Sequence, residues 1–429
     1  MWSSPCKVGL RPAPLAVAAI FLLTAIALSN LLPLWLDEII QLRETRNTTP
    51  AQLIASLPKQ PGAAPLGYLI QQTALRITGY SVRRARLPSA IFIAGTVLIV
   101  AFIGAQLGLS KPWLGAALFA LFPLTLRYAC ESRIYSQALF FSTLATLLFL
   151  RLAQKPTILR TAAYCLALTA AIYTQPYAIF VAFAHITWAK RKLKPIAGVT
   201  LAIAAFAPWY VAARTIWSSG IAGAQLHFVL SAKTPLMLFR EVAGAGYWGS
   251  GLLLILCALA KANRFLLLLI AVPVILALTA DGLFGYFVAT RQILWILPAI
   301  ALLAAFAIDR KPRIALPIAI LLAAVCIWQS IHYFTSPREN WQIAADALAL
   351  ETKKGGCLIV VPPQQQPSYE FFRPELSQAQ CPAARTVVAF TPYATKEQRD
   401  TAASALIAQG YTRQQATEAG KTQIELYTR

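Results

Sequence analysis

Acidic residues are scarce in this chain, and three of them stand beside long apolar segments. Asp37 and Glu38 follow the first apolar run in LWLDE, and Glu131 lies between two later runs in LRYACESRIYSQA. A carboxylate next to hydrocarbon is costly to maintain, so such residues tend to be functional. A carboxylate can also take a proton from the hydroxyl group of an acceptor. Asp37, Glu38 and Glu131 are therefore the candidate catalytic residues.

Arginines gather at the same boundary as these acids. Arg86 precedes the second apolar run in SVRRARLPSA, Arg133 follows Glu131 by two positions, and Arg291 opens a later run in FGYFVATRQILW. A guanidinium group presents a planar fork of donors that matches phosphate oxygens, and it stabilises negative charge on a leaving phosphate. Carboxylates and arginines together at the edge of apolar segments predict a site for a lipid substrate that carries a phosphate.

A purely structural role is the alternative for each of these residues. Asp37 and Glu38 would then begin a solvated helix, and Glu131 with Arg133 would form a surface ion pair worth less than about 1 kcal/mol. The arginines around Arg86 would bind anionic lipid headgroups. We favour a common site because all of these residues fall on one predicted face of the membrane.

The elements that must position these residues are membrane helices. Hydrophobic residues make up 58% of the chain and charged residues only 13%, whereas ordinary soluble domains carry roughly 25% charged residues. Apolar runs of membrane-spanning length predict a polytopic α-helical membrane protein with about eleven transmembrane helices. The predicted spans lie near residues 13–34, 87–107, 113–129, 136–152, 161–175, 177–189, 195–213, 249–260, 265–280, 292–308 and 314–334.

The distribution of charge predicts the topology. The net charge is +22, but the basic residues recur in short clusters such as KRKLK at 190–194, which argues against nucleic-acid binding. Short, strongly basic loops belong in the cytoplasm. This rule places the N-terminus in the cytoplasm, and it places the first loop (35–86) and the region after residue 334 on the opposite side of the membrane.

The region 335–429 differs from the rest in composition and is predicted to form its own domain. It carries ten basic and nine acidic residues, and its apolar pattern predicts an amphipathic helix, the strands CLIVV and RTVVAF, and a final helix and strand. The predicted division is a transmembrane module over 1–334 and a small α/β domain over 335–429. The latter shows no nucleophile or metal motif, so we expect a lid or support. A disulfide between Cys357 and Cys381 is left open.

Taken in order, several motifs resemble the bacterial C-type (GT-C) glycosyltransferases of the protein O-mannosyltransferase and lipid A aminoarabinose-transferase type. LWLDE is similar to the acidic motif in the first periplasmic loop of that family, and ESRIY is similar to its Glu-x-Arg-x-Tyr segment. AAPLGYLIQQ and RLPSA look like its Pro-Leu-x-Tyr and Arg-Leu-Pro-Ser segments. The resemblance covers nearly the whole chain. It implies a GT-C-like module in the bacterial inner (plasma) membrane, with the C-terminal domain in the periplasm.

The activity that the resemblance implies is that of an inverting glycosyltransferase. Such an enzyme moves a sugar from a polyprenyl-phosphate-sugar donor to an envelope lipid, polymer or protein at the periplasmic face of the membrane. Asp37 would be the catalytic base or a carboxylate that orients the acceptor, with Glu38 beside it and Glu131 as a second carboxylate. The residues that would position the donor or hold its phosphate are Arg86, Arg133, Tyr135 and Arg291. The three histidines match no family motif, so no metal ligand is predicted and metal dependence is left open.

Two functions of other classes also fit the sequence. A transporter or flippase of a lipid-linked sugar would need arginines and a hydrophobic cavity as well. A non-catalytic scaffold would use the C-terminal domain to bind an envelope partner. Neither the sugar nor the acceptor follows from the sequence, because both depend on the geometry of a few loop residues.

Overall fold

The computed structural model describes residues 12–60, 62–189, 193–223, 233–260, 263–284, 289–336, 338–378 and 384–429. The chain divides into two compact units. The first combines Met1–Ser29 with Thr45–Phe334, and the second combines Asn30–Glu44 with Thr335–Arg429. The acidic motif around Asp37 therefore belongs to the same unit as the C-terminal region.

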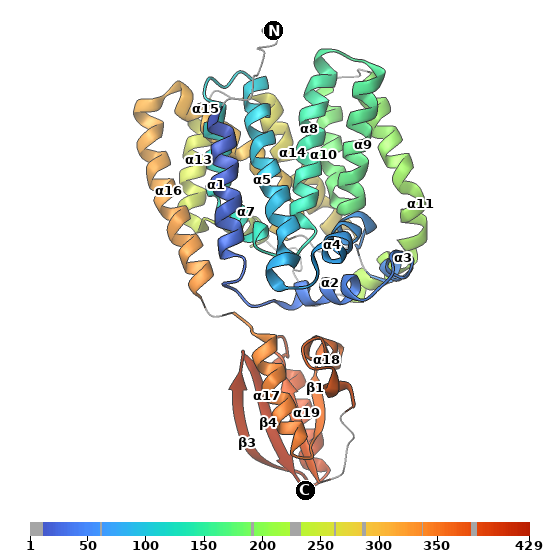
Figure 1. The fold of residues 1–429 in the computed structure, drawn as a ribbon. Helices are drawn as coiled ribbons and strands as arrows, with labels where there is room; N and C mark the ends of the chain where they lie inside the picture. The colour runs from blue at the N-terminus through green and yellow to red at the C-terminus, as the bar shows by residue number, and fades with distance from the viewer. Residues whose placement is uncertain are drawn as a thin grey trace. The chain divides into compact units, whose positions relative to one another are not determined.

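The first unit is built from helices, most of which run side by side (Figure 1). Helix α5 packs against α1, α6 and α8, and α8 packs against α9. Helix α2 (Leu36–Arg46) begins in the second unit and ends in the first. The other helices are α1 (Pro12–Leu28), α3 (Pro50–Ser56), α4 (Pro65–Thr78), α5 (Val82–Gln106), α6 (Pro112–Leu121), α7 (Pro123–Ala129), α8 (Tyr135–Gln154), α9 (Ile158–Thr174), α10 (Ile179–Ala189), α11 (Leu193–Gly223), α12 (Thr234–Glu241), α13 (Gly246–Leu259), α14 (Arg264–Phe284), α15 (Leu297–Arg310) and α16 (Pro312–Thr335).

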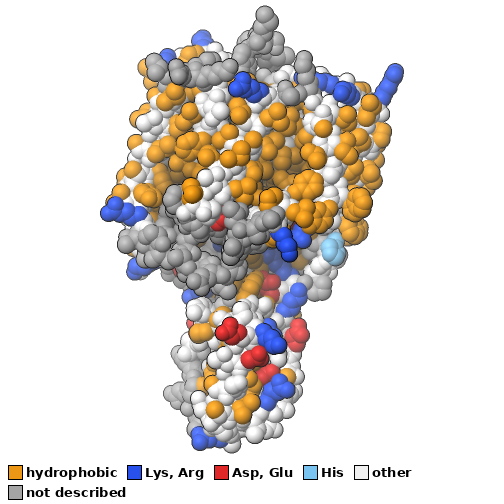
Figure 2. Space-filling model, turned by 180° about the vertical axis from the view of Figure 1, so that it is seen from behind, with side chains coloured by type: hydrophobic (Ala, Val, Ile, Leu, Met, Phe, Trp, Pro, Cys, Tyr) orange, Lys and Arg blue, Asp and Glu red, His pale blue; other side chains and the backbone are white. Residues whose placement is uncertain are grey.

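Several of these helices suit a bilayer. Within the described ranges, five helices are long and apolar enough to cross a membrane, namely α5, α8, α11, α14 and α16. The bent pair of α12 and α13 would make a sixth span, and four shorter apolar helices accompany them. Apolar side chains cover much of the face shown in Figure 2, and basic side chains lie toward the ends of the helices. A mostly helical membrane protein is thus confirmed, whereas the count of eleven spans stays a prediction.

A break at Phe122 divides one of the predicted spans. Pro123 lacks a backbone N–H, and it restricts the residue before it to an extended backbone. Phe122 accordingly has φ −60° and ψ 127°, so α6 ends and α7 begins as a separate short helix. The chain leaves α7 at Ala129 and passes through Glu131 before α8 begins. The predicted span 113–129 is therefore two helices, and the second leads directly into the predicted site.

A tight corner between α12 and α13 packs against the start of α7. The two helices meet at 82°, and Gly244 in the corner has φ +73°, a left-handed conformation that favours glycine. The Leu124 N–H donates to the Ala243 carbonyl at 3.1 Å. A Cβ on Gly244 would lie 2.8 Å from the Leu124 nitrogen. The glycine is thus required both for the turn and for the close approach.

The second unit contains a four-stranded sheet in the order β1-β2-β4-β3 (Figure 1). Strands β1 and β2 are parallel, and the other two pairs are antiparallel. Val387 and Val388 point to opposite faces of β2 and are both fully buried, so both faces of this strand are covered. The elements are α17 (Trp341–Lys353), β1 (Cys357–Val361), α18 (Gln366–Glu370), β2 (Arg385–Phe390), α19 (Lys396–Ala408), β3 (Thr412–Ala419) and β4 (Thr422–Thr428).

The predicted strands CLIVV and RTVVAF, the final helix and the final strand are confirmed, but β3 was not predicted. Its sequence TRQQATEA is almost entirely exposed, so this edge strand carries no apolar alternation from which it could be predicted. Cys357 takes part in a disulfide. Cys381, the partner considered from the sequence, lies outside the described residues.

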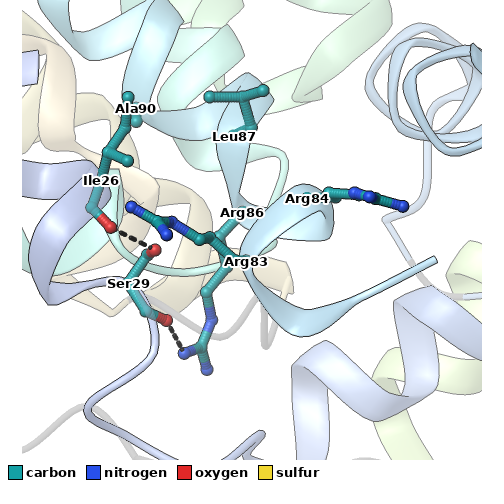
Figure 3. Close-up of a pocket in the computed structure, with 7 residues that line it drawn as sticks. All are labelled: Ile26, Ser29, Arg83, Arg84, Arg86, Leu87 and Ala90. Carbon is teal, nitrogen blue, oxygen red and sulfur yellow. Dashed lines mark hydrogen bonds between the residues drawn. The ribbon is translucent and has the colours of Figure 1, made fainter. Parts of the chain in front are cut away.

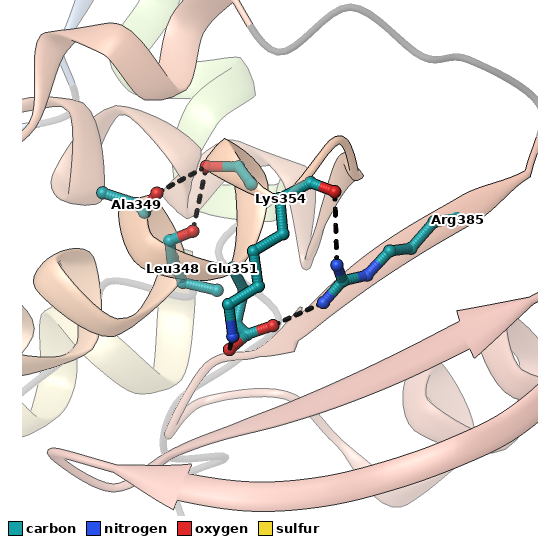
Figure 4. Close-up of polar contacts among 6 residues, drawn as sticks. Leu348, Ala349, Glu351, Lys354 and Arg385 are labelled. Atoms are coloured by element: carbon teal, nitrogen blue, oxygen red, sulfur yellow. Dashed lines mark hydrogen bonds and ion pairs between the residues drawn. The ribbon is translucent and has the colours of Figure 1, made fainter.

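Polar contacts join α17 to the sheet (Figure 4). The Glu351 carboxylate accepts from the Arg385 guanidinium at 2.6 Å and from the Lys354 ammonium at 2.7 Å. Arg385 also donates to the Lys354 carbonyl at 3.3 Å. These contacts tie the end of α17 to the first residue of β2. They give the C-terminal region a fixed internal frame.

Candidate active site

Glu131 is a buried carboxylate of the first unit, and several arginines lie near it. Glu131 is 1% exposed, and its Oε1 accepts from Arg127 Nε at 3.1 Å and from the Tyr333 hydroxyl at 2.8 Å. The Arg127 guanidinium also lies 5.1 Å from the centre of the Tyr333 ring. Because Glu131 is buried, it does not form the surface ion pair with Arg133 that was the structural alternative.

Arg133, Tyr135 and Arg291 lie in the same neighbourhood. The Arg133 guanidinium is 5.3 Å from the centre of the Tyr135 ring. The Tyr135 ring meets the Tyr128 ring edge-on at 5.3 Å, and the helical turn Leu294–Ile296, which follows Arg291, packs against α8. Residues from α7, the start of α8 and the turn before α15 therefore converge, although they are more than 150 positions apart in the sequence.

Arg86 lies on α5, one helical turn before Ser89, which contacts the backbone of Arg133. The Arg86 side chain is 1% exposed, and its Nη1 donates to the Ser29 carbonyl at the end of α1 at 2.5 Å. Ser89, three positions further along α5, approaches the Arg133 carbonyl at 3.4 Å. The beginning of α5 is thus fixed between α1 and the segment that follows Glu131.

A small pocket opens beside Arg86 (Figure 3). Its volume is about 160 Å³. Arginine side chains border apolar residues here, which is the combination that an anionic amphiphile needs. Figure 3 shows the Arg84 side chain directed away from Ser29, whereas Arg83 reaches toward the end of α1. The lining residues are Ile26, Ser29, Arg83, Arg84, Arg86, Leu87 and Ala90.

The loop that carries Arg291 is held by a second acid on the same unit. Thr290 Oγ1 donates to Glu241 Oε2 at 3.0 Å, and Glu241 also pairs with Arg240 at 2.9 Å. Glu241 ends α12, directly before the corner that packs on α7. This part of the chain therefore contacts both the start of α7 and the residue that precedes Arg291.

The other two predicted acids, Asp37 and Glu38, belong to the second unit. They occupy the first turn of α2, where a negative charge is favoured by the helix dipole. Glu38 is fully buried, and its Oε2 accepts from the Trp35 backbone N–H at 3.4 Å. The charge of Asp37 reaches Tyr393 of the C-terminal region. The pKa of Tyr393 is raised first by burial, then by Glu339, and further by Asp37.

Three residues of the cluster were not among the predicted site residues. Arg127 lies four positions before Glu131, the spacing of neighbours on a helix. Tyr128 follows it. Tyr333 lies 202 positions from Glu131, and only its location near the end of the last predicted span placed it on the same face. Among the described residues, no three His, Cys, Asp or Glu side chains meet in a metal-binding group.

No protein-family model matches this sequence, and no curated protein matches it either. Solved structures do match its fold. ArnT from Cupriavidus metallidurans in the apo state superposes with a TM-score of 0.59 at 14% identity, over 96% of this chain and 97% of the other. The same protein bound to undecaprenyl phosphate gives 0.57 at 13% identity, again over 96% and 97%.

A third structure, the Archaeoglobus fulgidus oligosaccharyltransferase in complex with Zn and sulfate, gives a TM-score of 0.46 at 13% identity, over 83% of this chain and 57% of the other. The two ArnT structures carry the structural argument, because they share the fold along nearly the full length of both chains. The chain therefore has the fold of ArnT over nearly its full length.

Proposed function

We propose that this protein is an inverting glycosyltransferase of the bacterial plasma membrane. It moves a sugar from a polyprenyl-phosphate-linked donor to a lipid, polymer or protein acceptor at the periplasmic face. The observation that carries the proposal is the cluster around Glu131, in which Arg127, Arg133 and Arg291 converge within a fold shared with ArnT. A structure of ArnT holds undecaprenyl phosphate, the type of lipid phosphate that such a cluster suits.

The reaction assigns a separate task to each kind of residue. The acceptor oxygen attacks the anomeric carbon from the side opposite to the phosphate, and the bond between that carbon and the phosphate oxygen breaks. Asp37 takes the proton that the acceptor hydroxyl loses, with Glu38 beside it in the motif. The departing polyprenyl phosphate gains negative charge. Arg86, Arg133 and Arg291 stabilise this charge, and Tyr135 positions Arg133.

Glu131 is suited to holding a cation rather than to taking a proton. Its Oε1 accepts from both Arg127 and Tyr333, and the contact with Arg127 is a charge-assisted hydrogen bond. We therefore assign Glu131 the orientation of the guanidinium groups next to the lipid phosphate. The pocket beside Arg86 would receive the part of the donor nearest that phosphate.

The test is sugar transfer in membranes that contain wild type or a variant, supplied with a panel of labelled polyprenyl-phosphate sugars and native envelope acceptors. Asp37→Asn keeps the size of the side chain and removes the base, so transfer should fall by at least about a hundredfold. Asp400→Asn in α19 is the matched control, because Asp400 is an exposed acid on the same unit. Loss in both variants, or in neither, would contradict the assignment of Asp37.

A further inference from the structure

The acidic motif is in contact with the C-terminal region through Trp35. The Arg338 guanidinium lies 5.0 Å from the centre of the Trp35 ring, and Trp35 is only 7% exposed. Trp35 precedes Asp37 by two positions, and its carbonyl accepts the Ile39 N–H at 3.1 Å in the first turn of α2. A cation held on this ring therefore fixes the turn that carries Asp37 and Glu38.

Tyr393 and Glu339 are also near Arg338. The Tyr393 hydroxyl donates to Glu339 Oε1 at 2.9 Å, and its ring stacks on Trp341 at 6.4 Å with the planes 14° apart. Trp341 is itself 1% exposed. The neighbours of Arg338 are thus fixed by the aromatic core of the C-terminal region, and Asp37 lies within electrostatic range of the same tyrosine.

Neither Tyr333 nor Arg338 was among the site residues predicted from the sequence. Tyr333, at the end of α16, donates to Glu131 in the first unit. Arg338 follows five positions later and contacts the acidic motif in the second unit.

We propose that Arg338 is a positioning residue that holds the Trp35–Glu38 turn against the C-terminal region and thereby orients Asp37 toward the acceptor hydroxyl. This inference rests on the proposed function, because it takes Asp37 as the base. The C-terminal region, expected from the sequence to be a lid or support, then forms part of the catalytic machinery. Small displacements of a catalytic group lower the rate steeply.

The first test measures the turn itself and requires no substrate. Hydrogen exchange of the full chain in lipid nanodiscs, followed by mass spectrometry, reports the protection of amides in 30–44. A cation–π contact contributes about 0.5–2 kcal/mol, so Arg338→Gln should speed exchange at Ile39 about two- to thirtyfold. Exchange in α5 should stay unchanged. Equal protection of 30–44 in both proteins would overturn the proposal.

The second test is transfer activity, with a matched control. Arg373→Gln removes an arginine that pairs with Asp346 at 2.6 Å elsewhere on the same unit. Arg338→Gln should lower kcat about tenfold or more and leave the KM for the donor unchanged, whereas Arg373→Gln should leave both unchanged. Arg338→Lys keeps a cation for the Trp35 ring and should restore most of kcat. A fall in kcat that matches a fall in folded protein, or no rescue by lysine, would contradict a positioning role.

The two tests separate this proposal from the proposed function. If Asp37→Asn retains full transfer while Arg338→Gln loosens 30–44, Asp37 is not the base and only the structural contact is correct. If Asp37→Asn abolishes transfer while Arg338→Gln changes neither exchange nor kcat, the function stands and Arg338 has no positioning role. Arg338→Gln should add little to the effect of Trp35→Leu, because the contact between the two residues is already lost in that variant.

Discussion

The hydroxyl group of Tyr333 should contribute measurably to the stability of the first unit. It donates at 2.8 Å to Glu131, whose side chain is 1% exposed. A hydrogen bond to a charged partner contributes about 1.5–3 kcal/mol. Glu131 keeps Arg127 as a second donor to the same oxygen, so Tyr333→Phe should cost about 2 kcal/mol rather than the upper value.

Thermal unfolding of the purified full chain in one detergent measures this cost. In a unit of this size a loss of about 2 kcal/mol lowers Tm by roughly 3 °C. Tyr247→Phe is the control, since Tyr247 is 48% exposed in α13 and its hydroxyl should contribute little. Glu131→Gln should lower Tm further, because it leaves the Arg127 guanidinium without its opposite charge.

A double-mutant cycle makes the contact itself testable. If Tyr333 acts through Glu131, Tyr333→Phe should cost much less in the Glu131→Gln background than in the wild type. The same cost in both backgrounds would refute the reasoning, and so would a Tm for Tyr333→Phe equal to that of the Tyr247→Phe control. Either result would mean that Tyr333, at the end of α16, does not stabilise the first unit through Glu131.

Three further outcomes follow from individual contacts. Gly244→Ala should destabilise the first unit by about 1–3 kcal/mol, seen as a lower Tm, because Gly244 has a φ of +73° and the new methyl group would lie 2.8 Å from the Leu124 nitrogen. An unchanged Tm would contradict the close packing of this corner on α7. Arg86→Gln should weaken binding of labelled undecaprenyl phosphate about tenfold or more, since it removes one cation from the proposed phosphate site. Lys194→Gln is the control and should bind normally, because the Lys194 ammonium donates to the Pro156 carbonyl at an exposed position. Burial and the hydrogen bond to Glu425 raise the pKa of Tyr427 to about 12, whereas the tyrosine of the unfolded chain loses its proton near pH 10. The stability that Tyr427 contributes is therefore complete below pH 10 and declines up to about pH 12. Tyr427→Phe should remove this part of the decline, measured as the midpoint of urea unfolding against pH.

Much of the fold could be predicted because hydrophobic burial dominates it. Apolar runs marked the membrane helices, and apolar strands between turns marked β1, β2 and β4 in the C-terminal region. Elements that depend on other forces were missed. The break at Phe122 comes from proline sterics inside an apolar run, and β3 is stabilised by backbone pairing at an exposed edge, where side-chain pattern carries little information.

Several of the predicted site residues lie together in the structure, whereas some of their neighbours there were not predicted. Scarce acids and arginines at the ends of apolar runs led to Glu131, Arg133 and Arg291, which the structure brings together with Tyr135. Tyr333 carries no charge and lies far away in the sequence, so nothing in its local pattern marked it. The grouping of Asp37 with the C-terminal region is likewise a tertiary contact that no local pattern encodes.

The central claim is that Asp37 is the base of a sugar transfer from a polyprenyl-phosphate donor. Its most direct test compares the rate of transfer by wild type and by Asp37→Asn in the same membranes, with the amount of folded protein and the affinity for undecaprenyl phosphate measured in parallel. We expect Asp37→Asn to lower transfer by at least about a hundredfold while folding and lipid binding stay normal. Equal transfer by the two proteins would contradict it.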